Sequence, residues 1–205
     1  LLQNRLNGNT SGRAAQLLPA LESADETVQL AGLAELTNML AMGNEDSLAG
    51  FPIKQLVPAL MLCIRHPHND EVVNKACQAL HYLLEALPRS SAHALAAIPA
   101  LLEKLESLEV IDIAEQALAA LEKLSLRHGK AIVQAGGLAA VLFPMDFFFG
   151  PSLYKALNVL ANCFQYMTSA DMAQVQPSLA SLSQRLRQHD PKMVERVCLC
   201  FCRLV

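Results

Sequence analysis

Tryptophan is absent from this 205-residue chain, and aromatic residues make up only 5% of it. Charged residues contribute 17%, and 16 Lys and Arg against 19 Asp and Glu give a formal net charge of −3. A nucleic-acid-binding protein concentrates its basic residues in a stripe or patch, because neutralising phosphates supplies most of its affinity. The basic residues here are scattered through the sequence, so we expect no nucleic-acid partner.

Long hydrophobic runs and alternating β-branched segments are also scarce. The longest uncharged apolar run, Gly136 to Met145, is far too short to cross a bilayer. Ala and Leu dominate the composition, which favours helices over strands. The chain does not begin with Met and does not open with a basic segment followed by a cleavage site. We therefore expect an all-α piece of a longer protein, with no membrane partner and with any targeting signal outside these residues.

The cysteines fall on apolar helical stretches, where a free cysteine behaves as a small buried hydrophobe. On a helix Cys198 and Cys202 share a face, but Cys200 points about 200° away from Cys198. Three metal ligands do not converge from this spacing, so we expect no metal and no cofactor. Free thiols fit a reducing, intracellular setting, in the nucleus or the cytoplasm. The six cysteines are Cys63, Cys77, Cys163, Cys198, Cys200 and Cys202.

An apolar helical pattern recurs five times along the chain. Its equivalent positions are Leu36, Leu80, Leu121, Leu160 and Phe201, which are 44, 41, 39 and 41 residues apart. A self-similar helical period near 40 residues is typical of armadillo and HEAT arrays. The sequence therefore predicts a repeat protein.

Each period contains a short first helix, a second helix and a long third helix, which favours armadillo units. We expect an all-α, right-handed superhelical armadillo solenoid of about five three-helix repeats in one domain, with the third helices on its concave face. The approximate units are residues 13–43, 44–87, 88–128, 129–167 and 168–205.

The sequence QAGGL places Gly136 and Gly137 between a first and a second helix. A phosphate-binding loop would need GxGxxG after a strand, or Lys-Ser/Thr after the last Gly, and neither pattern is present. Armadillo units turn sharply at this point, and glycine enters positive φ at little cost. We expect both glycines to form a structural turn, and Gly137 to require a left-handed backbone.

A strip of polar positions follows the third helices at the repeat spacing. Asn162 occupies the position of the Asn with which armadillo peptide-binding domains hold a peptide backbone, but Asn158 stands where those domains place Trp. The strip is mixed in charge and poor in aromatic residues, so it suits a folded protein partner better than an extended basic peptide or a small molecule. The predicted strip consists of Asn38, Asn74, Gln78, Tyr82, Glu115, Lys123, Tyr154, Asn158, Asn162, Glu195 and Arg203.

We expect no catalytic residue in this chain. His66 and His68 flank a proline in a loop, and the other histidines are dispersed among different repeats. The one aromatic cluster, Phe147 to Phe149, is expected to cap a junction between helices and to bury two of its three rings.

Long stretches of the sequence resemble one protein family. They include MGNEDSLAGFPIKQLVPAL, NKACQALHYLLEALPRSSA, the segment from AIPALLEKL to QAGGLAAVL, and CLCFCRLV. These stretches look like the N-terminal armadillo region of the ubiquitin-fusion-degradation ligases and their thyroid-receptor-interacting animal relatives, which are HECT-type E3 ubiquitin ligases. The resemblance runs from about Leu30 to Val205.

The resemblance implies a parent enzyme that receives ubiquitin from a conjugating enzyme on a cysteine of a C-terminal HECT domain, which these residues do not contain. The chain itself would help to position ubiquitin or a ubiquitinated substrate, in protein ubiquitination and ubiquitin-dependent degradation. The alternative is a stand-alone armadillo adaptor of the importin or catenin type. The missing Trp positions and the weak net acidity of the strip disfavour that alternative.

Overall fold

The computed structural model of the chain describes residues 2–48, 50–108 and 110–204. Within these ranges the chain forms helices and connecting turns and no strand, which confirms the all-α prediction. The α-helices are α1 (Leu2–Leu21), α2 (Glu26–Ala41), α3 (Ile53–Ile64), α4 (Asp70–Ala86), α5 (Ile98–Ser107), α6 (Ile111–Gln134), α7 (Gly137–Leu142), α8 (Gly150–Phe164), α9 (Met172–Val175), α10 (Leu179–Arg185) and α11 (Pro191–Leu204). The 3₁₀ helices are η1 (Pro88–Ala97), η2 (Phe143–Phe147) and η3 (Gln176–Ser178).

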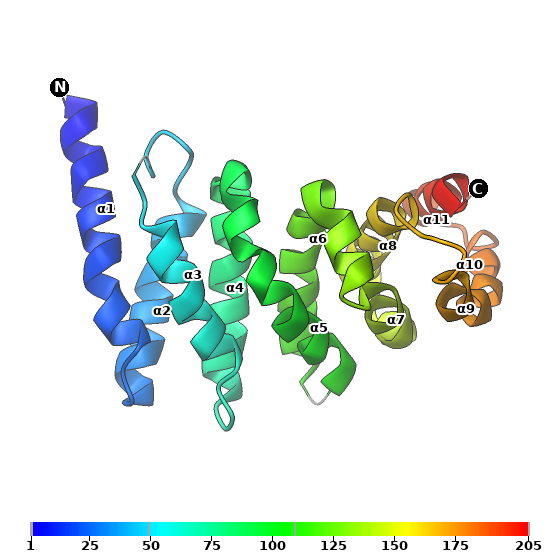
Figure 1. Ribbon diagram of the computed structural model, residues 1–205, viewed down its shortest axis with the longest axis horizontal. Coiled ribbons are helices and arrows are strands. Elements are labelled where there is room, and N and C mark those ends of the chain that lie inside the picture. Colours follow the sequence, from blue (N-terminus) through cyan, green and yellow to red (C-terminus); the bar gives the residue numbers. More distant parts are fainter. Residues whose placement is uncertain (1, 49, 109, 205) are drawn as a thin grey trace.

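The helices stack side by side into an elongated solenoid, with the two termini at opposite ends (Figure 1). The predicted third helices α2, α4, α6, α8 and α11 form one row, in which each helix packs against the next. We call this the third-helix row. A second row begins with α1, α3, α5 and α7, which pack against one another and against the third-helix row. The armadillo-type solenoid expected from the sequence is therefore confirmed.

The core runs continuously along the solenoid between the two rows. Leu36, Leu80, Leu121 and Leu160 have 0% of their surface exposed, and Phe201 packs against the core from a partly exposed position. Burying the same position in successive units is what stabilises a repeat protein, since each unit alone cannot cover its apolar face. The repeat register predicted from these residues is therefore the one that the fold uses.

The elements before the second helices are less regular than expected. Residues 45–48 form turns instead of a short helix, and α1 begins at Leu2, well before residue 13. Before α5 the corresponding element is the 3₁₀ helix η1. Before α7 it is the last part of α6, which continues beyond a kink at His128 with φ −128° and ψ 28°. The third helices are thus regular, whereas the short first helices vary from unit to unit.

The turn between α6 and α7 lies at the predicted glycines, but only one of them has a left-handed backbone. Gly136 has φ +83°, and a Cβ atom added there would meet nothing within 4 Å. Gly137 is the first residue of α7 and does not have a positive φ. A Cβ atom on Gly137 would lie 2.3 Å from Cγ2 of Ile132 and 2.7 Å from its carbonyl oxygen. The prediction of a left-handed Gly137 is wrong, because this glycine is needed for space.

The aromatic cluster buries one ring instead of two. Phe148 is 1% exposed, whereas Phe147 is 58% exposed and Phe149 is 77% exposed. Phe148 and Phe149 both have extended backbones, at φ −91°, ψ 142° and φ −131°, ψ 159°. Consecutive side chains of an extended segment point to opposite sides, so burying Phe148 turns its two neighbours outward.

The hydrophobic content of the chain does not produce a membrane-spanning helix within the described ranges. No single helix there is both long and apolar enough to cross a bilayer. The bent pair Ile111–Gln134 and Gly137–Phe147 meets the length and composition requirement only when its two parts, at 116° to each other, are taken together.

Candidate protein-interaction surface

The structure places every residue of the predicted strip on the third-helix row. Asn38 lies on α2; Asn74, Gln78 and Tyr82 lie on α4; Glu115 and Lys123 lie on α6; Tyr154, Asn158 and Asn162 lie on α8; Glu195 and Arg203 lie on α11. All of them are partly or fully exposed. The repeat spacing therefore identified one row of accessible positions, and the structure then shows which side chains are already bonded.

Asn162 is bonded through both ends of its side-chain amide. Its Nδ2 donates to Oγ of Ser125 on α6 at 2.9 Å, and its Oδ1 accepts from Nη1 of Arg203 on α11 at 2.8 Å. Arg203 also donates to the carbonyl oxygen of Ala161 at 3.0 Å. The three consecutive helices are thus joined by hydrogen bonds, and the Asn162 amide is not available to hold a peptide backbone while these bonds persist.

Lys123 and Asn158 are bonded to carboxylates of the preceding helix. Nζ of Lys123 lies 3.2 Å from Oε1 of Glu85 on α4, and Nδ2 of Asn158 donates to Oε1 of Glu122 at 2.6 Å. Nε2 of His81 lies 3.6 Å from Oε2 of Glu85. Each carboxylate therefore has a donor from a neighbouring repeat.

His81 lies within the third-helix row, where burial lowers its pKa below the ordinary value. The positive charges of Lys123 and Lys155 lower the pKa further, while the backbone of Ala119 and the carboxylate of Glu85 act in the opposite direction. Nδ1 of His81 is buried without a hydrogen-bond partner. Because a buried imidazolium is costly, His81 is neutral near pH 7.

Tyr154 is held between α8 and α11. Its hydroxyl donates to Oδ2 of Asp190, and the guanidinium carbon of Arg196 lies 4.8 Å from the centre of its ring. The hydrogen bond raises the pKa of Tyr154 and lowers the pKa of Asp190. Asp190 also accepts from the backbone N–H groups of Lys192 and Met193 at the start of α11. Tyr154 therefore joins two repeats.

The side chains of Asn38, Tyr82, Glu115 and Glu195 make no hydrogen bond or ion pair with any residue in the described ranges. Tyr82 contacts the ring of His81, with centroids 5.3 Å apart. These four side chains lie on the same row as the bonded ones. They are the members of the strip that can contact a partner without first breaking a bond within the protein.

A groove lies at the C-terminal ends of α2, α4 and α6. It consists of two adjoining cavities of about 510 Å³ and 140 Å³, both lined by Glu85, Pro88 and Arg127. Tyr82 lines the larger cavity and Lys123 the smaller one. We call it the helix-end groove, and it extends the strip to the edge of the solenoid.

The sequence analysis missed Glu85, His81 and Arg127. Glu85 follows Tyr82 by one helical turn, so its place on the accessible side of α4 is apparent from the spacing. Its pairing with Lys123, 38 residues later, depends on how the two helices stack. No pattern within one repeat signals such a contact.

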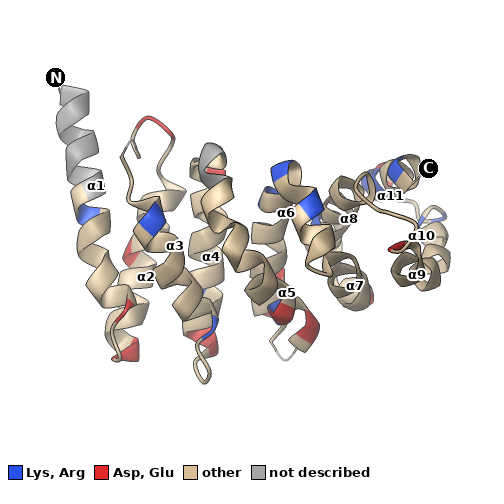
Figure 2. Ribbon diagram, in the orientation of Figure 1, with Lys and Arg blue, Asp and Glu red and all other residues tan. Residues whose placement is uncertain are grey.

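The charges on the surface are mixed. Lys and Arg are interspersed with Asp and Glu along the solenoid instead of forming a continuous stripe (Figure 2). Asp70 and Glu71 lie in the first turn of α4, and Asp112 lies in the first turn of α6, where the helix dipole favours acids.

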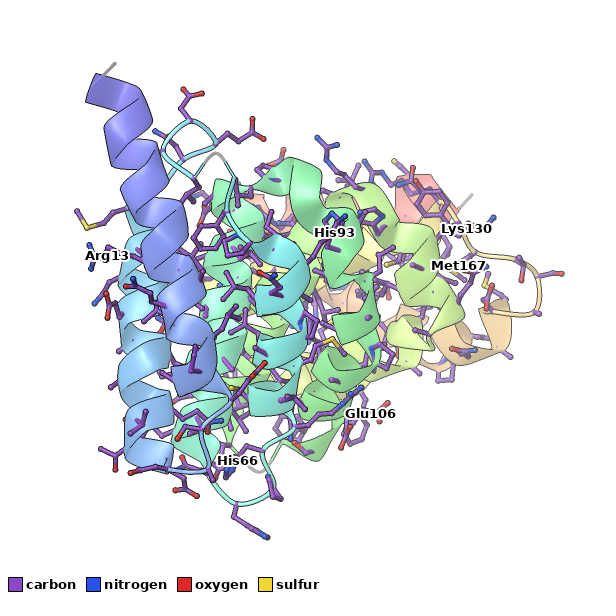
Figure 3. All side chains as sticks on the ribbon, turned by 60° about the vertical axis from the view of Figure 1, so that its left-hand side comes forward. Arg13, His66, His93, Glu106, Lys130 and Met167 are labelled. Atoms are coloured by element: carbon purple, nitrogen blue, oxygen red, sulfur yellow. The ribbon has the colours of Figure 1, made fainter. Side chains whose placement is uncertain are left out.

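The described residues contain no cluster of three or more His, Cys, Asp or Glu that could hold a metal ion. His66 and His93 lie in different parts of the solenoid (Figure 3). Nδ1 of His66 accepts the backbone N–H groups of Asn69, at 3.1 Å, and His68, at 3.4 Å, so this imidazole orders its own loop. The histidines are therefore not assembled into a site.

The cysteines are not uniformly buried as expected. Four of them are buried, and burial raises the pKa of Cys63 to about 11 and the pKa of Cys200 to about 12. Cys198 and Cys202 are exposed on α11. The helical spacing placed Cys200 opposite the other two correctly, but it did not show that their side of α11 is uncovered.

These features define an armadillo-type repeat scaffold with a polar, protein-binding type of surface. A family model described as E3 ubiquitin-protein ligase TRIP12-like, TPR repeats, matches residues 2–134. The chain therefore belongs to this family of E3 ubiquitin-protein ligases, which confirms the resemblance noted in the sequence.

Two relatives match along nearly the whole chain. The E3 ubiquitin-protein ligase TRIP12 of Danio rerio is 48% identical over 206 residues, which cover 100% of this chain and 10% of the relative. The E3 ubiquitin-protein ligase UPL3 of Arabidopsis thaliana is 33% identical over 201 residues, which cover 97% of this chain and 11% of the relative. The chain thus spans about a tenth of the length of these relatives.

The type of repeat is settled by the fold. A designed armadillo repeat protein, solved in complex with the peptide (KR)4, superposes with a TM-score of 0.73 at 16% identity, covering 92% of this chain and 80% of the designed one. The family description names TPR repeats, which are two-helix units of about 34 residues. The spacing of 39 to 44 residues between equivalent positions is that of armadillo units.

Proposed function

We propose that this chain is the protein-recognition region of a HECT-type E3 ubiquitin ligase, and that its third-helix row binds ubiquitin or a ubiquitinated substrate. Membership of the TRIP12-like family supports the ligase context. The mixed, polar strip supports a folded partner, because protein interfaces combine a few aromatic and long polar side chains with a hydrated rim.

The chemistry of transfer belongs to other parts of the parent protein in this proposal. A HECT domain outside these residues would receive ubiquitin from a conjugating enzyme and pass it to a lysine. The repeat region would hold the acceptor close to the reacting groups, and such positioning can supply a large part of a rate enhancement. The pathway is protein ubiquitination and ubiquitin-dependent degradation, in the nucleus, the cytoplasm or both.

One observation carries the proposal about the surface. Tyr82, Glu115 and Glu195 are unbonded, while Lys123, Asn158 and Asn162 on the same row are fixed by bonds between repeats. A surface whose scaffold is already ordered loses less conformational entropy when a partner binds. The row is therefore suited to binding a folded protein with little rearrangement.

The direct test is titration of fluorescently labelled ubiquitin and ubiquitin chains with the 205-residue chain, followed by anisotropy. We expect saturable binding. No saturation below about 1 mM, which corresponds to less than about 4 kcal/mol of binding free energy, would contradict ubiquitin as the partner. That result would leave the family assignment intact and would redirect the search to substrate proteins.

A further inference from the structure

The helix-end groove contains three charged side chains with known partners and one without. Glu85 is paired with Lys123 at 3.2 Å and with His81 at 3.6 Å. Glu45 also has an interaction partner. Arg127 is exposed and makes no ion pair or hydrogen bond through its side chain with any residue that the structure describes. The uncompensated charge in the groove is therefore positive.

An apolar wall lies beside Arg127. Leu126 lines the smaller cavity and is 68% exposed, although most leucines of the third-helix row are buried. Leu84 and Pro88 line the same cavity from the side of α4. Removing apolar surface from water gains about 25 cal/mol per Å², so covering Leu126 would add to the affinity of any partner that reaches this wall.

The ends of the helices supply the third component of the groove. Helix α4 ends at Ala86, and Leu87 leaves the helical conformation with φ −130° and ψ 64°. The last carbonyl groups of a helix lack intrahelical donors and accept hydrogen bonds from water or from a ligand. A peptide backbone brings N–H donors for these carbonyl groups, whereas a free inorganic anion brings none and meets the negative end of the helix dipole.

We propose that the helix-end groove binds an acidic and apolar segment of a partner protein. An Asp or Glu carboxylate of that segment pairs with Arg127, and a neighbouring apolar side chain packs against Leu126. The carboxylate comes from a side chain within the segment, and the backbone N–H groups of the segment face the end of α4. This site is additional to the ubiquitin-binding row, and its existence does not depend on ubiquitin binding.

The test uses the 205-residue chain and short fluorescein-labelled peptides with amidated C-termini. The first peptide alternates pairs of Glu and Leu, the second replaces Glu by Gln, the third replaces Glu by Lys, and the fourth replaces Leu by Ser. Anisotropy titrations should show the tightest binding for the Glu–Leu peptide. Raising the ionic strength from about 0.05 M to 0.5 M should weaken it, because both charges lie at an exposed site.

Two substitutions in the groove are matched by two controls on α3. Arg127→Glu should lower the affinity for the Glu–Leu peptide by about tenfold or more, because an attraction becomes a repulsion. Leu126→Asp should have a similar effect through lost apolar contact and added charge. The controls are Lys54→Glu and Leu62→Asp, since Lys54 is exposed and Leu62 is 63% exposed. Both controls should bind like the unsubstituted chain.

Several outcomes would overturn the proposal. These are equal binding of the Glu and Lys peptides, no binding of any peptide, or an unchanged affinity for both Arg127→Glu and Leu126→Asp. Binding only by a peptide with a free C-terminal carboxylate would also overturn it. Circular dichroism confirms that each variant is folded. Ubiquitin titration of the same variants separates the two sites, since ubiquitin binding should persist when the peptide no longer binds.

Discussion

Asn162 on α8 accepts a hydrogen bond of 2.8 Å from Arg203 on α11, and it donates one of 2.9 Å to Ser125 on α6. One amide thus connects three consecutive third helices. The residue expected to hold a peptide is part of the structure that holds the repeats together. This arrangement changes what a substitution at the position should do.

Asn162→Ala should destabilise the protein by about 1–3 kcal/mol, because it leaves partly buried donors and acceptors of Ser125 and Arg203 unpaired. Asn38→Ala is the matched control, since Asn38 occupies the equivalent position on α2 and its side chain is exposed and unbonded. Urea unfolding followed by circular dichroism measures both. Equal stability of the two variants would mean that the bonds of Asn162 add nothing to the folded state.

The sequence located the third-helix row because burial imposes the same register on every repeat. Leu36, Leu80, Leu121 and Leu160 are all fully buried, and this demand is visible as a period of about 40 residues. The bonding of the strip was not visible. The contact between Asn162 and Arg203 joins residues 41 positions apart, and it depends on side-chain directions that no local pattern specifies.

The variable parts of the fold were also the hardest to predict. The short first helices contribute little apolar surface, so local turn geometry decides whether they become η1, an extension of α6 or only turns. Phe148 is buried while its two neighbours are exposed, because an extended backbone alternates their directions. Composition and spacing do not distinguish these outcomes.

The two glycines between α6 and α7 should respond differently to substitution. Gly137→Ala should cost about 1–3 kcal/mol, because its Cβ would overlap the side chain and carbonyl oxygen of Ile132. Gly136→Ala should cost about 1–2 kcal/mol through its left-handed backbone, in open space. Asn tolerates that backbone better than Ala does. Gly136→Asn should therefore recover stability relative to Gly136→Ala, whereas Gly137→Asn should not, and the opposite pattern of melting temperatures would refute this assignment.

Cys198 and Cys202 should react with iodoacetamide far faster than the four buried cysteines. Burial raises the pKa of Cys77, Cys163 and Cys200 to about 12, so little thiolate is available at pH 8. A time course of alkylation, read by peptide mass spectrometry, gives a rate for each residue. Slow reaction of Cys198 and Cys202 that becomes faster on dilution would show that another copy of the chain covers α11.

His81 should make the protein less stable in mild acid. Burial lowers its pKa in the folded state below the ordinary value of 6.5. The unfolded chain therefore binds the proton first as the pH falls below about 6.5, and stability decreases until the folded-state pKa is passed. Above that window both states are neutral and His81 contributes no pH dependence.

His81→Gln should therefore lose less stability than the unsubstituted chain between pH 7.5 and the acid side of that window, as measured by urea midpoints at each pH. His128 is also lowered in pKa by burial, so part of the acid sensitivity should remain. His68→Gln, in an exposed loop, is the control and should behave like the unsubstituted chain. An unchanged pH profile for His81→Gln would show that the imidazole is charged in the folded protein.

Tyr82→Ala combined with Lys123→Ala should weaken the binding of ubiquitin chains by about 1–3 kcal/mol while leaving the fold intact. Tyr82 offers an unbonded, amphipathic ring at the groove, and Lys123 exchanges its pairing with Glu85 for a carboxylate or carbonyl group of the partner. In the full-length ligase the same pair should slow chain modification more than loading of the HECT cysteine, because only acceptor positioning is lost. The control is Lys54→Ala combined with Leu62→Ala on α3, which should bind normally. Equal affinities for the two double variants would place the ubiquitin site elsewhere, most simply at the loops along the edge of the solenoid.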